Sequence, residues 1–98
     1  MKMTFRHYGN DDPISLEYIA QIPGVTGVMV MMNEWEAGEV WEKDVFQEYV
    51  DKCHAVGLEC EIIESINVHE DIKMGLPSRD KYIENYKQSL RNVAACGV

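Results

Sequence analysis

The side chains best suited to chemistry are concentrated in one stretch, Cys60–Lys73, which reads CEIIESINVHEDIK. It opens with the apolar pair Ile62 and Ile63, which is typical of a buried strand. Two acids, a hydroxyl, an amide and a histidine then follow within seven residues: Glu64, Ser65, Asn67, His69 and Glu70. In α/β proteins, ligands and catalytic groups gather where parallel strands end and the loops begin. The stretch therefore predicts a functional site at the end of this strand.

A second polar group, Arg6-His7-Tyr8, stands at the end of an expected first strand. Arg6 is suited to holding a carboxylate through two parallel hydrogen bonds. Its alternative role is an ion pair with Glu64 or Glu70 at neighbouring strand ends. We expect Arg6, His7 and Tyr8 to contribute to substrate binding.

Glu64 and His69 complete the set of candidate substrate-binding residues. Histidine changes its charge near neutral pH, so His69 is suited to binding hydroxyl groups or moving a proton. Its alternative role is to cap a loop. Glu64 is suited to orienting Arg6, and a purely structural role is equally compatible with its position. A metal site made of Glu64, His69 and Glu70 alone is disfavoured, because adjacent side chains on an extended chain point apart.

The elements that must position these residues follow from the hydrophobic pattern. Asp12 and Pro13 form a helix-start signal, and Gly57 stands where a left-handed helix end is expected. Ser78 is expected to cap the last helix, and the loop 69–77 has room for one helical turn. The expected strands are Met3–His7, Val25–Met32 and Leu58–Ser65, and the expected helices are Pro13–Gln21, Glu42–Val56 and 79–96.

The order is therefore strand–helix three times. Each connection between strands is long enough to hold a helix, which predicts an α/β fold with a parallel sheet. Three parallel strands leave two unpaired edges and too little cover for their apolar faces. A TIM (β/α)8 barrel takes about 250 residues. We expect residues 1–98 to be a single partial domain, the first three βα units of such a barrel, incomplete by itself.

Composition and charge narrow the possible partners. The chain has 9 Lys and Arg against 17 Asp and Glu, a formal net charge of −8. That balance disfavours a nucleic-acid backbone or an anionic membrane as a partner. The three cysteines are an odd number without CxxC spacing, which favours a reducing compartment. No signal peptide and no apolar run of about 18 residues is visible, so we expect a cytoplasmic protein.

Several segments together resemble the N-terminal part of the mannonate dehydratase family. They are FRHYG, DPISLEYIAQIPGVTGV, GEVW, IESINVHEDIK and ENYKQSLRN. The resemblance covers essentially all 98 residues, and the block IESINVHEDIK is its most specific part. Two positions depart from the family pattern: His7 stands where the family usually has Trp, and Trp35-Glu36-Ala37 replaces a proline-containing turn. The first departure is expected at the mouth of the site.

The resemblance implies a metal-dependent barrel enzyme of the xylose-isomerase-like kind. Such an enzyme is a hydro-lyase of hexuronate (glucuronate) catabolism that converts D-mannonate to 2-keto-3-deoxy-D-gluconate and water with Mn²⁺ or Fe²⁺. It further implies that the metal ligands and the acid/base residues lie beyond Val98, so none is assigned here. A fragment of this length is expected to be inactive alone, and the full-length protein is expected to be a homo-oligomer.

Two other readings of the residues stay open. One is a truncated sugar-acid epimerase or isomerase of the same barrel class. The other is a non-catalytic α/β module that binds a partner through its open sheet edge.

Overall fold

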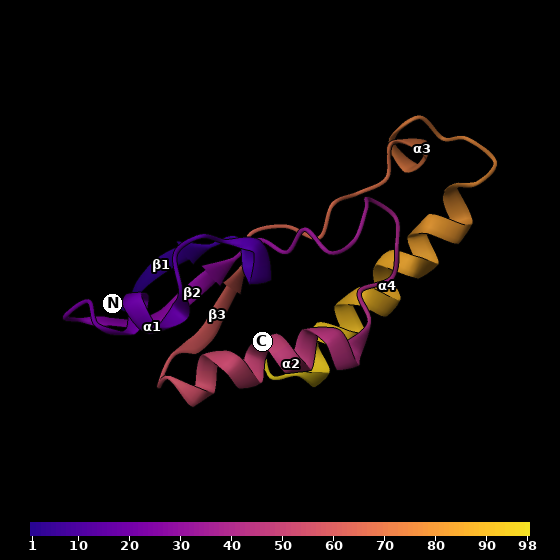
Figure 1. Ribbon diagram of the computed structural model, residues 1–98. Coiled ribbons are helices and arrows are strands. Elements are labelled where there is room, and N and C mark those ends of the chain that lie inside the picture. Colours follow the sequence, from indigo (N-terminus) through magenta and orange to yellow (C-terminus); the bar gives the residue numbers. More distant parts are fainter.

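The computed structural model describes residues 1–98, and its core element is a three-stranded parallel sheet in the order β1-β2-β3. Figure 1 shows this sheet at the left and a long arm of loops and helices extending to the right. The strands are β1 (Met3–His7), β2 (Val25–Val30) and β3 (Glu59–Ile63). The helices are η1 (Gly9–Asp11, one 3₁₀ turn), α1 (Leu16–Ala20), α2 (Lys43–Ala55), α3 (Glu70–Lys73) and α4 (Arg79–Ala95).

The register of the strands separates two faces of the sheet. Arg6 pairs with Met29, and Met29 pairs with Ile62, so these three side chains form one row. This row is open to solvent, since Arg6 and Ile62 are both exposed. The next row starts at His7, which pairs with Val30, and both residues are buried. Because successive side chains on a strand point to opposite faces, the sheet has one open face and one covered face.

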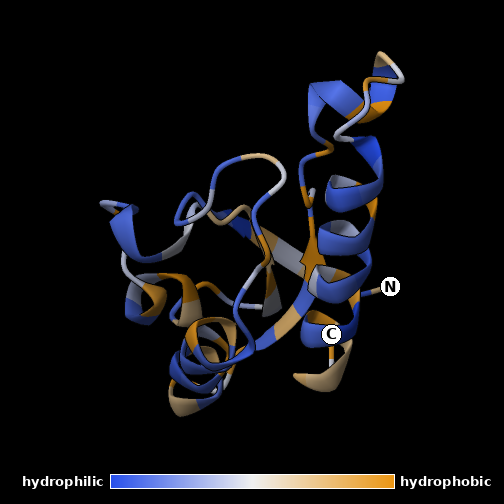
Figure 2. Cartoon of the chain, turned by 90° about the vertical axis from the view of Figure 1, so that its right-hand side faces the viewer, coloured by the Kyte–Doolittle hydropathy of each residue, from blue (hydrophilic) through white to orange (hydrophobic).

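The covered face carries the hydrophobic core. Parallel strands in sequential order, joined by crossovers of the usual right hand, place α1 and α2 on the same side of the sheet. Figure 2 shows orange, hydrophobic segments turned inward and a largely blue outer surface on the helix that leads to the C-terminus. The buried core residues are Ile19, Val28, Val30, Met32, Trp41, Phe46, Tyr49, Val50, Cys53, Leu58, Cys60, Val93 and Cys96.

The arm consists of the β2–α2 loop, α3 and α4. It is held together by α4, which binds the β2–α2 loop through three polar side chains. Asn85 donates to the carbonyl oxygen of Gly38 at 3.0 Å. The hydroxyl of Ser89 accepts from the buried backbone N–H of Trp41 at 2.9 Å, and Asn92 donates to the Trp41 carbonyl at 2.8 Å. The loop is therefore fixed to α4 along two helical turns. Its extension gives the molecule principal dimensions of 49 × 27 × 21 Å.

The three strands and the α-helices follow the predicted order, whereas the 3₁₀ helix η1 was not predicted and several boundaries differ. The expected helix start at Asp12 and Pro13 is wrong, because α1 begins at Leu16 with Ser15 as its cap. The Ser15 hydroxyl accepts from the N–H of Tyr18 at 3.2 Å. Strand β2 ends at Val30 and β3 spans Glu59–Ile63, so both expected strands were two or more residues too long.

Most other local expectations are confirmed. Gly57 has a φ of 81° directly after α2 and its cap Val56, as a left-handed helix end requires. One helical turn, α3, lies in the loop 69–77. Ser78 stands directly before α4 as expected, but its side chain does not cap the helix, because its hydroxyl donates to the Asp71 carboxylate at 2.6 Å. All three cysteines are free and buried. None of the helices has the length and apolar character needed to cross a bilayer.

Candidate functional site

The candidate site is built around Arg6, which lies at the end of β1 on the open face. Its Nη2 forms an ion pair with the Glu64 carboxylate just beyond the end of β3, as one of the two predictions for Arg6 stated. Its Nη1 donates to the hydroxyl of Tyr8 at 3.2 Å. The hydrogen bond to Tyr8 and then the charge of Glu64 raise the pKa of the Arg6 guanidinium. Arg6 is therefore a permanent cation whose orientation is fixed from two sides.

The guanidinium group keeps donors available for a ligand. It carries five N–H donors in a planar fork, and the two contacts above occupy two of them. The Arg6 side chain is 44% exposed and that of Glu64 is 33% exposed, so solvent reaches the pair. A carboxylate arriving from the open face would meet a planar cation that is already oriented.

His69 is held in a separate cluster on the arm. Its ring stacks on the ring of Tyr82, with centroids 3.8 Å apart and planes inclined by 5°. Gly38 lies against the edges of both rings: a Cβ built on it would stand 2.7 Å from Tyr82 and 2.8 Å from His69. The β2–α2 loop, α3 and α4 therefore meet at this cluster of Gly38, His69 and Tyr82.

The capping hydrogen bond of α3 defines the tautomer of His69. Its Nδ1 accepts from the backbone N–H of Asp71 at 3.0 Å. The Asp71 carboxylate also lies 3.7 Å from the same nitrogen, but an ion pair there would need a proton on Nδ1. The shorter contact of Nδ1 is with the N–H, so in a neutral ring Nδ1 accepts and the proton is on Nε2. The capping role expected as the alternative for His69 is therefore present.

The structure does not bring Arg6 and His69 into contact. No hydrogen bond or ion pair joins their side chains: Arg6 lies within β1, whereas His69 is the cap residue of α3. Four residues of chain lie between Glu64, the partner of Arg6, and His69, and extended chain covers about 3.3 Å per residue. Substrate binding by Glu64 and His69 together stays a prediction.

His7 lies on the covered face, not beside Arg6. It is 4% exposed, with Nδ1 2.7 Å from the hydroxyl of Tyr49 and Nε2 3.1 Å from the carbonyl oxygen of Ile14. The expected position of His7 at the mouth of the site is therefore wrong. A direct contact of His7 with substrate stays a prediction that its two occupied nitrogens disfavour.

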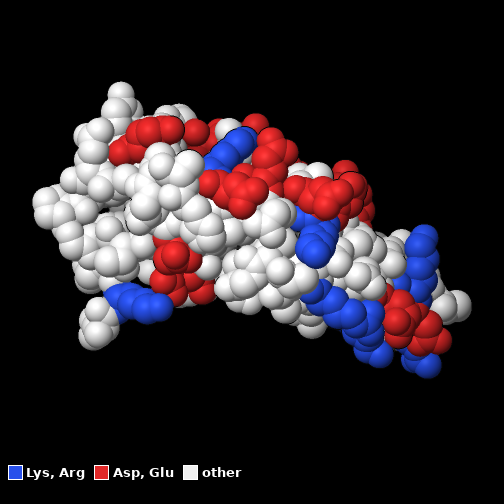
Figure 3. All heavy atoms as spheres, turned by 90° about the horizontal axis from the view of Figure 1, so that it is seen from below, with Lys and Arg blue, Asp and Glu red and all other residues white.

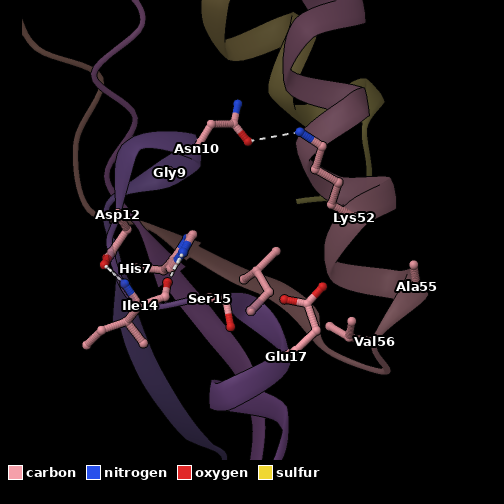
Figure 4. Close-up of a pocket in the computed structure, with 11 residues that line it drawn as sticks. His7, Gly9, Asn10, Asp12, Ile14, Ser15, Glu17, Lys52, Ala55 and Val56 are labelled. Carbon is pink, nitrogen blue, oxygen red and sulfur yellow. Dashed lines mark hydrogen bonds between the residues drawn. The ribbon is translucent and has the colours of Figure 1, made fainter.

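Behind the sheet, His7 borders a cleft of about 320 Å³ between the β1–α1 turn and α2. Figure 4 shows Asn10 reaching across this cleft to Lys52, at 3.2 Å, and Asp12 beside Ile14. The Asp12 carboxylate accepts from the N–H groups of Ile14 at 2.8 Å and Tyr8 at 2.9 Å. These bonds, that to Ile14 first, lower the pKa of Asp12. Every charged or amide group named here already has a partner within the chain.

A second cleft of about 310 Å³ lies beside Glu64, between the end of β3 and α4. Its lining is mostly apolar, with Ile66, Tyr86 and Leu90 opposite the acid. Sequence reasoning pointed to Glu64 but missed the α4 residues, because no polar pattern distinguishes them from an ordinary helix face. Gly38 and Tyr82 were missed as well, and the only signal for Gly38 was a glycine between two tryptophans.

The chain gathers no group of three or more His, Cys, Asp or Glu side chains that could hold a metal ion. Burial raises the pKa of the Cys53 thiol to about 11 and that of Cys60 to about 12, so neither is a ready thiolate ligand. The side chains of these 98 residues do not by themselves form a binding site for a divalent cation.

The distribution of charge on the surface is uneven. Figure 3 shows Lys and Arg gathered toward the right-hand end, over α3 and α4, with acidic groups spread over the rest of that face. On the arm these charges form local pairs, Lys73 with Glu70 at 3.0 Å and Lys87 with Glu84 at 3.2 Å. They are solvated helix faces and not an anion-binding patch.

The fold and the site together define a mixed α/β protein with a parallel sheet and an oriented guanidinium–carboxylate pair at the strand ends. The family model of D-mannonate dehydratase (UxuA) matches residues 1–98. The chain belongs to this family.

Relatives and a solved structure agree with this assignment. The mannonate dehydratase of Lachnoclostridium phytofermentans is 58% identical over 99 residues, covering 100% of this chain and 28% of that protein. That of Shouchella clausii is 52% identical over 98 residues, covering 99% and 27%. The crystal structure of mannonate dehydratase from Streptococcus suis serotype 2 matches with a TM-score of 0.94 and 48% identity, covering 100% of this chain and 28% of that one. The chain thus spans about 28% of the length of these proteins.

Proposed function

We propose that the full-length protein is a cytoplasmic hydro-lyase that dehydrates D-mannonate to 2-keto-3-deoxy-D-gluconate in hexuronate catabolism. The observation that supports this most is the family match over the whole chain, at 58% identity to a protein named mannonate dehydratase. A match of this extent favours the dehydratase over a related epimerase or a non-catalytic module.

The reaction removes a proton from the carbon next to the carboxylate and a hydroxyl group from the adjacent carbon. The resulting enol becomes the 2-keto product, and the proton and hydroxyl leave as water. The substrate carboxylate is negatively charged both in the bound substrate and in the transition state, so a fixed cation beside it binds the two equally. Arg6, held by Glu64 and Tyr8 on the open face, is our assignment for that cation.

The open face of the sheet supports the proposal that residues 1–98 form the first three βα units of a TIM barrel. Arg6, Met29 and Ile62 would then line the interior, which side chains fill in such barrels. The Mn²⁺ or Fe²⁺ implied by the family would supply Lewis acidity. We place its ligands mainly in segments outside these 98 residues, since this chain brings together no group of three or more His, Cys, Asp or Glu side chains.

The first test is activity with and without the remaining chain. The full-length protein supplied with Mn²⁺ is expected to form the 2-keto-3-deoxy acid from D-mannonate, and the 98-residue chain is expected to form none. Turnover by the short chain would contradict the proposed location of the metal ligands. An inactive full-length protein, tested with both Mn²⁺ and Fe²⁺, would contradict the proposed activity.

The second test concerns Arg6. In the full-length protein, Arg6→Lys keeps the charge but loses the planar fork, so the KM for D-mannonate is expected to rise about tenfold or more. Lys2→Met is the matched control, because Lys2 pairs with Glu61 at 3.0 Å elsewhere in the sheet. An unchanged KM in Arg6→Lys would remove Arg6 from the proposed site.

A further inference from the structure

For a neutral His7 ring, the two hydrogen bonds have one consistent direction. The Ile14 carbonyl can only accept, so the nitrogen 3.1 Å from it, Nε2, carries the proton. A neutral ring then has a lone pair on Nδ1, and the Tyr49 hydroxyl 2.7 Å away is the donor to it. The chain of bonds runs from Tyr49 through His7 to Ile14, and we name these three residues the His7 relay.

The donor end of the relay is firmly buried. Tyr49 is 0% exposed on α2, and its ring stacks on that of His7 with centroids 5.7 Å apart. Burial, as the largest cause, raises the pKa of Tyr49, so its hydroxyl keeps its proton. A buried hydroxyl without an acceptor is costly, and His7 Nδ1 supplies one.

The acceptor end closes the turn that follows β1. Ile14 is bonded at both backbone groups, through its carbonyl to His7 and through its N–H to Asp12. The other oxygen of the Asp12 carboxylate accepts from the N–H of Tyr8. Three hydrogen bonds made by side chains therefore fix the backbone from residue 7 to residue 14. Arg6 and Tyr8 are the sequence neighbours of His7, whose ring is the central group of the relay.

The side chains of the three consecutive residues Arg6, His7 and Tyr8 lie on both faces of the sheet. His7 points into the covered face, whereas the side chains of Arg6 and Tyr8 bond to each other and the Arg6 guanidinium reaches Glu64. A displacement of His7 would therefore move both neighbours. We propose that His7 is a positioning residue, which holds Arg6 and Tyr8 in place for the substrate carboxylate through its bonds to Tyr49 and Ile14 and does not contact substrate. This inference rests on the proposed function for its ligand, a sugar acid.

The test removes one atom of the relay in the full-length protein. Tyr49→Phe deletes the donor hydroxyl and keeps the ring, so the stacking on His7 is preserved. The KM for D-mannonate is expected to rise about fivefold with kcat changed by less than about twofold. Tyr18→Phe is the matched control, since Tyr18 is 66% exposed on α1 and takes no part in the relay. The control is expected to leave KM unchanged.

A double-mutant cycle distinguishes positioning from general destabilisation. If the relay acts through Arg6, Tyr49→Phe is expected to change KM by less than about twofold in an Arg6→Lys background. Equal fold-changes in the two backgrounds, or an unchanged KM in Tyr49→Phe, would overturn the proposal.

Nitrogen NMR of the same protein separates this inference from the proposed function. The His7 ring is expected as the Nε2–H tautomer, and Tyr49→Phe is expected to shift the guanidinium signals of Arg6. An Nδ1–H tautomer, or unchanged Arg6 signals, would refute the relay whether or not the protein dehydrates D-mannonate. Full relay signals in a protein inactive on D-mannonate would instead refute only the assigned activity.

Discussion

At the scale of single residues, Gly38 shows how closely the arm is fitted together. Its φ of 91° is strained for any residue with a side chain. Its missing Cβ also leaves room for the stacked rings of His69 and Tyr82. Glycine is therefore required at this position by its own backbone and by its neighbours.

Gly38→Ala is expected to lower the free energy of unfolding by about 3 kcal/mol or more, from strain together with overpacking. Gly24→Ala is the control, because its φ of 84° is equally strained but nothing lies within 4 Å of an added Cβ. That variant is expected to lose only about 1–2 kcal/mol. Urea denaturation of the full-length variants measures both values, and equal losses would show that the rings move aside.

The polar residues after β1 and β3 were identifiable from the sequence because they interrupt apolar strands. Which of them share a face was not. Arg6 and His7 differ by one position, so they point to opposite sides, and only the helices that cover one side decide which is buried. His7 consequently lies in the packing between sheet and helices, and not among the groups that face solvent.

At the scale of elements, α4 serves mainly as a polar binding surface for a loop. Its buried face includes Ser89 at 0% exposure, whereas the neighbouring apolar residue Leu90 is 46% exposed. Hydrophobic periodicity predicted the existence of α4 but gave no signal for the burial of Ser89. A buried serine that satisfies a backbone N–H looks, in the sequence, like any solvent-facing serine.

Ser89→Ala tests this surface. Losing the hydroxyl leaves the N–H of Trp41 buried without an acceptor, which is expected to cost about 1–3 kcal/mol of unfolding free energy. Ser65→Ala, whose hydroxyl bonds only to the exposed Asn67 side chain, is expected to cost less than about 0.5 kcal/mol. Comparable losses in the two variants, measured by denaturant unfolding, would contradict the assigned role of Ser89.

The start of α1 was mispredicted for a similar local reason. Asp12-Pro13 is a strong helix-start signal, but the Asp12 carboxylate bonds to the N–H groups of Tyr8 and Ile14 and so forms a turn. The helix begins only after Ser15. Residues 12–15 are therefore not helical, and both Ile14 and Tyr18 are exposed. Ile19 is the residue of α1 that enters the core.

At the scale of the whole molecule, the core holds its thiols in the neutral form. Cys53 and Cys60 have pKa values raised from 9.0 to about 11 and about 12, chiefly by burial. In the unfolded chain these thiols ionise near pH 9, while in the folded chain they keep their protons. Their contribution to stability is therefore complete below pH 9 and is lost as the pH rises toward 12.

The unfolding free energy of the protein is accordingly expected to fall between pH 9 and about 11. Cys60→Val keeps an apolar side chain of similar size at that position, so its decline over the same interval is expected to be shallower. Urea unfolding at a series of pH values compares the two slopes. Identical slopes would show that Cys60 does not contribute to the alkaline loss.

The regular spacing of the loop-binding side chains on α4 has a consequence for how this helix can change. Three side chains on one side of the helix form hydrogen bonds to the Gly38–Trp41 segment, those of Asn85, Ser89 and Asn92. Each residue of an α-helix turns the chain by about 100°. Adding or deleting a single residue between Asn85 and Asn92 would rotate one of these two side chains away from the loop. α4 can therefore accept exchanges of side chains far more readily than changes of length.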